Sequence, residues 1–179
     1  GDLGIKAEGE RLLASMGIYV FKRSVMQELL DNDLTDFGKH IIPNAISSHR
    51  VFSYVYEGYW EDIGTIRSFF EANLDSTAEL PKFNFFDMNA PIYTRARFLP
   101  ASKINGAGID HAVISDGCII SWAQISQSVI GVRSVINPGS RLHRVVAMGN
   151  DSFESAESIK ENLANGRPAV GIGSNCRID

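Results

Sequence analysis

The chain has 179 residues, of which 44% are hydrophobic and 21% are charged. This balance is typical of a soluble globular protein and excludes a mainly disordered chain. The net charge of −4 gives no electrostatic basis for binding nucleic acid or an anionic membrane, so we expect neither partner. No apolar run approaches the roughly 18–20 residues of a membrane-spanning helix. The cysteines, Cys118 and Cys176, favour a reducing cytoplasm over a disulfide scaffold.

The first part of the chain has the pattern of a mixed α/β segment. Residues 13–21 form an apolar run with the length and composition of a buried strand. Ser24 is expected to cap a short helix that has apolar residues on one face. Residues 51–56 alternate in the manner of a second strand. A second helix is predicted to begin at Gly64-Thr65, where apolar residues follow at helical spacing.

Residues 79–100 are predicted to connect two domains. Prolines interrupt this stretch and leave few helical periods. Its aromatic and aliphatic side chains would be costly to expose to water, so we expect the connector to pack onto a domain. The expected divisions of the chain are residues 1–78, 79–100 and 101–179.

In the last part of the chain, aliphatic residues recur at six-residue steps, with a small residue at the fifth place of each copy. The copies are residues 114–120, 130–136, 136–142 and 172–178. This period predicts a parallel β-helix with small residues at its corners and with Ile130 and Ile136 pointing inward. Short strands of an ordinary β-sandwich are the alternative. Residues 152–165 interrupt the repeat and are expected to form a loop or short helix that leaves one coil.

Three segments, residues 14–21, 36–43 and 59–65, place a polar residue near a glycine, as α/β folds do where they hold ligands. Asp62 precedes a helix start, where its carboxylate either binds magnesium or only complements the helix N-terminus. Asp36 either bonds a sugar hydroxyl or is a turn residue. The pattern alone leaves both alternatives open.

Other candidate residues are one tryptophan and two arginines. Trp60 is either a core residue or a stacking platform for a ligand. Arg95 and Arg97 lie one residue apart in an extended segment, which suits binding of an anion. A solvated charged face is the alternative for this pair. The histidines have no Cys or carboxylate at metal-ligand spacing, so they are interpreted as structural.

Five short sequence segments, taken together, form a specific combination. They are ASMGIYVF, DFGKHIIP, YWEDIGT with its continuation FFEANL, PIYTRARFLPASKI and SVIGVRSVINPG. Together they resemble the ADP-glucose pyrophosphorylases, a family also called glucose-1-phosphate adenylyltransferases. The resemblance implies an α/β nucleotidyltransferase domain, of which this chain holds a remnant, followed by a left-handed parallel β-helix. It implies the Mg²⁺-dependent reaction of ATP with glucose 1-phosphate to give ADP-glucose and pyrophosphate, in glycogen or starch synthesis.

The resemblance also implies roles for individual residues. Ser15 stands where the family contacts glucose 1-phosphate. Asp36, Phe37 and Trp60 fall in the segments that line the sugar pocket. Asp62 matches an aspartate that lies on the sugar side of the site and binds the metal.

A further implication concerns regulation and assembly. Arg95 and Arg97 match a region near the anion site between the domains, where phosphorylated effectors act allosterically. The family forms tetramers, so the resemblance implies a homo-oligomer. Its location would be the cytoplasm or, in a plant, the plastid.

The sequence also departs from the family pattern. It has no Gly-rich loop with its catalytic arginine, no second metal aspartate and no lysine for the sugar phosphate, and its β-helix ends at Asp179 in mid-pattern. We therefore expect a piece cut at both ends that is inactive alone. The alternative is a naturally separate, catalytically silent module for regulation and assembly. A β-helix acyltransferase is disfavoured because His111 and His143 have no supporting motif.

Overall fold

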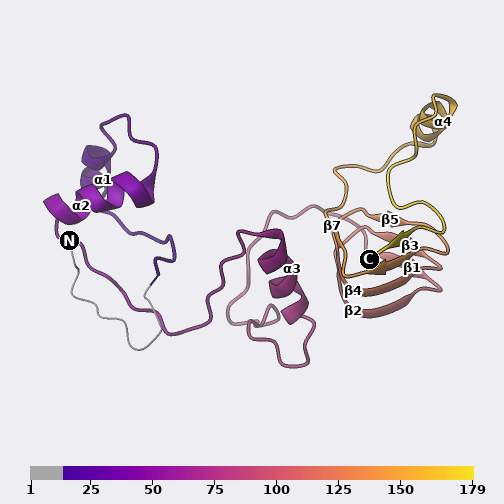
Figure 1. The fold of residues 1–179 in the computed structure, drawn as a ribbon, viewed down its shortest axis with the longest axis horizontal. Coiled ribbons are helices and arrows are strands. Elements are labelled where there is room, and N and C mark those ends of the chain that lie inside the picture. The colour runs from indigo at the N-terminus through magenta and orange to yellow at the C-terminus, as the bar shows by residue number, and fades with distance from the viewer. Residues whose placement is uncertain (1–13) are drawn as a thin grey trace. The chain divides into compact units, whose positions relative to one another are not determined.

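The computed structural model describes residues 14–179. This part of the chain divides into two compact units, one that ends at Trp60 and one formed by Glu61–Asp179 (Figure 1). Among the described residues, no helix combines the length and the apolar character needed to cross a bilayer.

The first unit is a small helical cluster. Helix α1, Arg23–Leu29, is followed by a π-helical turn, η1, Phe37–Ile41, which runs directly into α2, Ile42–Ser48. The core of this unit consists of buried apolar side chains with two half-buried neighbours: Leu29, Ile41 and Ala45, with Phe21 and Val25. The predicted helix after Ser24 is confirmed, but its N-cap is Lys22, which makes no side-chain capping bond.

The two strands predicted for this unit are wrong. Residues 14–21 and 51–56 form no strand, and Leu13, where the first prediction begins, lies outside the described residues. Val20 is 98% exposed and Phe52 is 83% exposed. A strand is stable only when a neighbouring strand satisfies its backbone groups, and the described part of this unit offers none. The apolar alternation therefore produces extended chain without a sheet.

The second unit begins with helix α3, Ile66–Asp75. The predicted start is confirmed, because Thr65 is the N-cap and forms a reciprocal capping box with Ser68. On the exposed face of this helix, Arg67 Nε donates to Glu71 Oε1 over 2.8 Å. The hydrogen bond and the negative charge of Glu71 raise the pKa of the Arg67 guanidinium above its usual value.

Residues 79–100 contain no helix or strand. The expectation that their apolar side chains pack onto a domain is wrong for most of them, since Phe86, Tyr93 and Phe98 are 84%, 91% and 96% exposed. Phe83 and Phe85 instead contact each other edge to face, with ring centroids 5.0 Å apart. Local aromatic contacts thus replace docking in this stretch. The proposed domain divisions at residues 78 and 100 remain predictions.

The rest of the second unit is a parallel β-helix, whose strands stack as successive coils in Figure 1. Its strands are β1 (Lys103–Asn105), β2 (Gly108–Ile114), β3 (Ile119–Ser121), β4 (Gln124–Ile130), β5 (Val135–Ile136), β6 (Arg141–His143), β7 (Val146–Ala147) and β8 (Arg177–Ile178). One sheet has the order β1-β3-β5, and the other has the order β2-β4-β6-β8, with β7 also paired to β4. All strand pairs of the described residues are parallel, so each coil repeats the path of the coil before it.

Aliphatic columns fill the interior of the β-helix. Ile120 pairs with Ile136, and Ile125 pairs with Leu142 on another face. Ile130 is completely buried and lies in register with Ile114. The prediction that Ile130 and Ile136 point inward is therefore confirmed, and the sandwich alternative is excluded.

Small residues form only some of the corners of the β-helix, namely Gly106, Gly117, Gly139 and Gly149, which have a positive φ as expected. The corner positions have a positive φ, and many carry large side chains: His111, Trp122, Gln127, Arg133, Arg144 and Asn175. The small residues follow the corners and are buried, as for Ser140, whose hydroxyl donates to the Gly173 carbonyl of the next coil over 2.7 Å. Their size matters because they fit inside the coil, where their polar groups must form hydrogen bonds.

The interruption of the repeat is a helical excursion, as predicted. Helix α4, Ala156–Ala164, has Ser155 as its N-cap. After the excursion, the Ile172 N–H donates to the Val135 carbonyl over 2.8 Å, and Ile172 pairs with Ile136. The chain thus returns to the register of the coils that it left.

Candidate functional site

Ser15 lies in a tight turn of the first unit, beside a tyrosine. Its Oγ accepts a hydrogen bond from the Gly17 N–H over 3.2 Å and lies 3.1 Å from the Tyr19 hydroxyl. Gly17 has φ of +71°, a conformation that a residue with a Cβ adopts only under strain. This turn therefore brings two hydroxyl groups together at the molecular surface.

Phe37 joins the same group of side chains. Its ring stacks on Tyr19 with centroids 6.4 Å apart and an interplanar angle of 18°, and it meets Phe21 edge to face at 6.3 Å. Phe37 is 36% exposed, so part of the ring remains accessible. We call Ser15, Tyr19, Phe21 and Phe37 the aromatic cluster.

Asp36 adds a carboxylate next to the aromatic cluster. It is the N-cap of η1, and its Oδ1 accepts from the Lys39 N–H over 2.8 Å. The turn-residue alternative is therefore realised, and the second carboxylate oxygen can still accept a hydrogen bond from a ligand. Hydroxyls, a carboxylate and an accessible ring are groups that can bind the polar and apolar parts of a sugar.

Tyr19 is the functional candidate that sequence reasoning missed. It lies in a segment that was singled out, but the expected site residues do not include it. A phenol four residues after Ser15 was the available signal, since a tyrosine at a surface usually uses its hydroxyl. The structure shows that Tyr19 connects Ser15 to Phe37.

Trp60 ends the first unit, and Asp62 belongs to the second. Trp60 is 43% exposed, which leaves part of its ring available for stacking. Asp62 Oδ1 accepts from the Gly64 N–H over 2.9 Å, just before the N-cap of α3. This bond agrees with the helix-start interpretation and leaves Oδ2 for a cation. Within residues 14–179, no group of three or more His, Cys, Asp or Glu side chains is placed to hold a metal.

Arg95 and Arg97 are exposed and lie outside any helix or strand of the second unit. Their exposure is compatible with an anion site and also with a solvated charged face. The expected role in effector binding remains a prediction.

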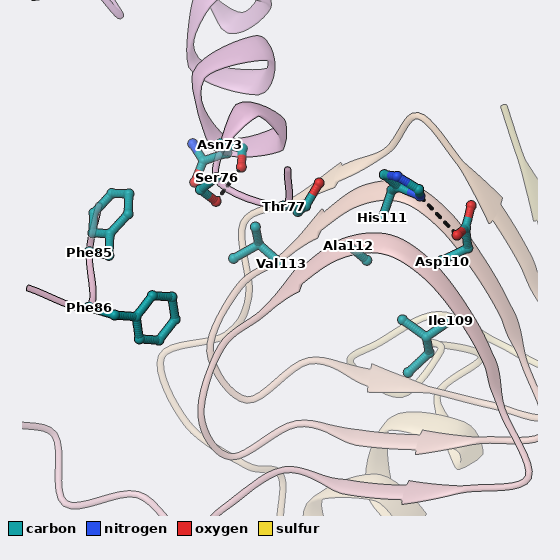
Figure 2. Close-up of a pocket in the computed structure, with 10 residues that line it drawn as sticks. All are labelled: Asn73, Ser76, Thr77, Phe85, Phe86, Ile109, Asp110, His111, Ala112 and Val113. Carbon is teal, nitrogen blue, oxygen red and sulfur yellow. Dashed lines mark hydrogen bonds and ion pairs between the residues drawn. The ribbon is translucent and has the colours of Figure 1, made fainter. Parts of the chain in front are cut away.

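A surface pocket of about 730 Å³ lies between the end of α3, the connector and β2 (Figure 2). Its polar wall includes an ion-pair candidate, with Asp110 Oδ1 and His111 Nδ1 2.8 Å apart. Ser76 and Thr77 reach it from α3, while Phe86 approaches from the connector. None of the site residues expected from the sequence lines this pocket.

Two families match separate parts of the chain. Residues 6–79 match the nucleotidyl transferase family, and residues 97–179 match the GLGC left-handed parallel beta-helix domain. The glucose-1-phosphate adenylyltransferase large subunit 1, chloroplastic/amyloplastic, of Zea mays is 44% identical over 169 residues, which are 93% of this chain. The chain is homologous to this adenylyltransferase subunit along most of its own length. It spans about a third (33%) of the length of this curated relative of the adenylyltransferase family.

The two family matches confirm the expected fold class. Nucleotidyl transferase sequence precedes a β-helix, and the parallel strand pairs of the second unit agree with the matched left-handed domain. These matches do not test the roles of single residues. The expected roles of Ser15, Asp36, Phe37, Trp60 and Asp62 therefore stay predictions.

Proposed function

We propose that this chain contributes the sugar-phosphate side of the active site and the β-helix of an enzyme that makes ADP-glucose for starch or glycogen synthesis. A phosphate oxygen of glucose 1-phosphate attacks the α-phosphorus of ATP. The bond from that phosphorus to the bridging oxygen of the β-phosphate breaks, and pyrophosphate leaves. The 44% identity to a named glucose-1-phosphate adenylyltransferase across 93% of the chain is the observation that supports this proposal most strongly.

The aromatic cluster and Asp36 are proposed to bind the sugar phosphate. The Ser15 and Tyr19 hydroxyls, 3.1 Å apart, can donate to the phosphate or to a sugar hydroxyl. Asp36 accepts from a sugar hydroxyl, while Phe37 and Trp60 present partly exposed rings to the apolar face of the sugar. These contacts orient the attacking oxygen, which is the main contribution that a protein makes to phosphoryl transfer.

Asp62 is proposed as a ligand of Mg²⁺. Its exposed carboxylate fits the preference of this ion for hard oxygen donors, and Mg²⁺ is often held by one or two carboxylates together with substrate phosphates. When bound, Mg²⁺ neutralises negative charge that develops on the phosphates. The Gly64 N–H bond fixes the orientation of the carboxylate, so that Oδ2 has a defined direction.

Regulation and assembly are proposed for the second unit. We infer that Arg95 and Arg97 bind the phosphate of an allosteric effector and that the β-helix takes part in subunit assembly. The relative is named a large subunit, which supports a multi-subunit enzyme. Its chloroplastic/amyloplastic name supports a plastid location if the chain comes from a plant, and we propose the cytoplasm otherwise. A catalytically silent module with these same two tasks is the alternative function.

The test is Asp62→Asn in an active adenylyltransferase that contains this sequence. Loss of a metal ligand should lower kcat on the order of 10²-fold or more. Asp87→Asn is the matched control, because Asp87 Oδ1 also accepts from the N–H two residues later, over 2.9 Å. Pyrophosphate release from ATP and glucose 1-phosphate measures both variants. A near-normal kcat for Asp62→Asn would reject the metal role and leave Asp62 as a helix-start residue.

A further inference from the structure

Helix α3 lies along one corner of the β-helix. The positive-φ residues of this corner, His111, Gln127 and Arg144, occupy equivalent positions of successive coils. The Arg144 guanidinium lies over the Phe70 ring, with Cζ 5.7 Å from the centroid. Just beyond the C-terminal end of the helix, Thr77 lines the same pocket as His111 (Figure 2). The segment from Phe70 to Thr77 therefore spans from the third coil to the first.

The backbone that carries Arg144 is fixed by the neighbouring coil. Its N–H donates to the Ser126 carbonyl over 3.2 Å, and its φ is +57°. The preceding residue, His143, has its Nδ1 2.9 Å from Ser126 Oγ. Arg144 thus projects from a rigid corner, and its side chain presents a cation to the face of an aromatic ring, which is an attractive arrangement.

Helix α3 packs on the β-helix through partly buried side chains. None of its residues is fully buried, and its strand contacts are mainly with β2 and β4. Phe70 is half-buried, and the Arg144 guanidinium adds a contact from a further coil to those that hold the helix.

The segment that precedes α3 is tied to its first turn. Asp62 Oδ1 accepts from Gly64 N–H, and Thr65 then caps the helix through Ser68. Movement of the helix start must therefore be transmitted to Asp62 through a few hydrogen-bonded residues. The orientation of Asp62 is set by the unit that contains the β-helix.

We propose that Arg144 is a positioning residue for Asp62, acting through Phe70 and α3. The inference rests on the proposed function, because Asp62 matters only if it serves the reaction. Arg144 does not touch the substrates in this proposal. It holds the helix whose first turn orients the Asp62 carboxylate.

Hydrogen exchange on the 179-residue chain tests the contact without any activity assay. Arg144→Ala should raise exchange of the Gly64, Ser68 and Phe69 amides by about two- to fivefold, the range expected for loss of one exposed cation–π contact. Arg144→Lys should restore most of the protection because it keeps a cation over the ring. Arg141→Ala, which removes an exposed arginine from the same strand region, should leave these amides unchanged.

A second variant guards against a general loss of folding. Phe70→Leu keeps an apolar side chain but removes the ring, and it should reproduce the exchange of Arg144→Ala while the amides of β3 and β4 stay protected. Unchanged exchange at Gly64 and Ser68 in both variants would overturn the proposal, as would equal loosening of the β-helix strands.

Enzyme kinetics distinguish the proposed role of Asp62 in the reaction from the proposed role of Arg144 in positioning it. The measurements use an active adenylyltransferase that contains this sequence. Arg144→Ala should raise the half-saturating Mg²⁺ concentration by about two- to fivefold, and Arg144→Lys should restore it. If Asp62→Asn keeps normal kcat, the proposed function of Asp62 fails. If Asp62→Asn is inactive but Arg144→Ala leaves the Mg²⁺ dependence unchanged, the positioning inference is wrong and the function stands.

Discussion

Ile136 lies directly over Ile120 where β5 pairs with β3, and the two side chains are only 1% and 0% exposed. On its other side Ile136 pairs with Ile172, the first residue to rejoin the coils after the α4 excursion. One side chain thus connects the continuous part of the solenoid to the part that follows the interruption. In a repeat structure, where each coil contacts only its neighbours, such a position carries more of the stability than a position at the end of the stack.

Ile136→Ala should lower the free energy of unfolding by about 2–5 kcal/mol, the usual cost of truncating a buried isoleucine. Thermal or denaturant unfolding followed by circular dichroism measures the change. Ile178→Ala is the control, since Ile178 is 39% exposed and should cost much less. Equal losses for the two variants would show that the column at Ile136 does not behave as a packed core.

The 179-residue chain by itself should not form ADP-glucose. Its sequence contains no Gly-rich loop to hold the triphosphate of ATP, and the proposed residues contact only the sugar side of the reaction. Pyrophosphate release by the purified chain, with ATP, glucose 1-phosphate and Mg²⁺, is the measurement. Turnover above the level of an Asp62→Asn sample would contradict this prediction.

Tyr19→Phe in an active adenylyltransferase should raise KM for glucose 1-phosphate by about 2- to 10-fold, the effect of one lost hydrogen bond. The stacking on Phe37 is retained, so the aromatic cluster should keep its fold. Tyr93→Phe removes a hydroxyl from a side chain that is 91% exposed and should have no effect. Initial rates at varied glucose 1-phosphate concentration give the KM values. Equal KM values for Tyr19→Phe and the unchanged enzyme would show that Tyr19 does not bind glucose 1-phosphate.

Arg97→Ala should weaken the response to a phosphorylated effector and leave basal activity mostly intact. Arginine can form two parallel hydrogen bonds to a phosphate, which alanine cannot replace. Activity titrated with the effector gives its half-saturation, and a melting curve reports stability. Arg50→Ala, an exposed arginine in the other unit, serves as control. A half-saturation that stays constant while stability falls would assign Arg97 to the structure of the connector.

The β-helix could be predicted because its sequence repeat is short and every coil requires it. Residues such as Ile130 and Ile136 recur at fixed steps, and every coil needs them for the same packing reason. The first unit has no sequence pattern that recurs in this way. Its apolar runs, including the one that contains Val20, resemble strands by composition, but a strand also requires a partner that no local pattern specifies.

The sequence singles out candidate site residues one by one, but it does not show which of them lie together. The position of Ser15 and Phe37 in separate strings gave no sign that Tyr19 lies between them, because that contact depends on the positive φ at Gly17. The contact between Arg144 and Phe70 joins residues far apart in sequence. It arises from a corner geometry that the period of the repeat does not encode, since the period specifies the inward-facing positions and not the residues at the corners.

The α4 excursion has a consequence for how such a protein diverges. Because Ile172 resumes pairing with Ile136 after the detour, the length of the detour is uncoupled from the register of the coils. Doubling the length of a flexible loop costs only about 0.6 kcal/mol in closure entropy. Insertions and deletions are thus tolerated here far better than elsewhere in the solenoid, where one added residue shifts a column out of line. This loop is accordingly a natural place for lineage-specific segments and for grafting a reporter peptide without disturbing the stack.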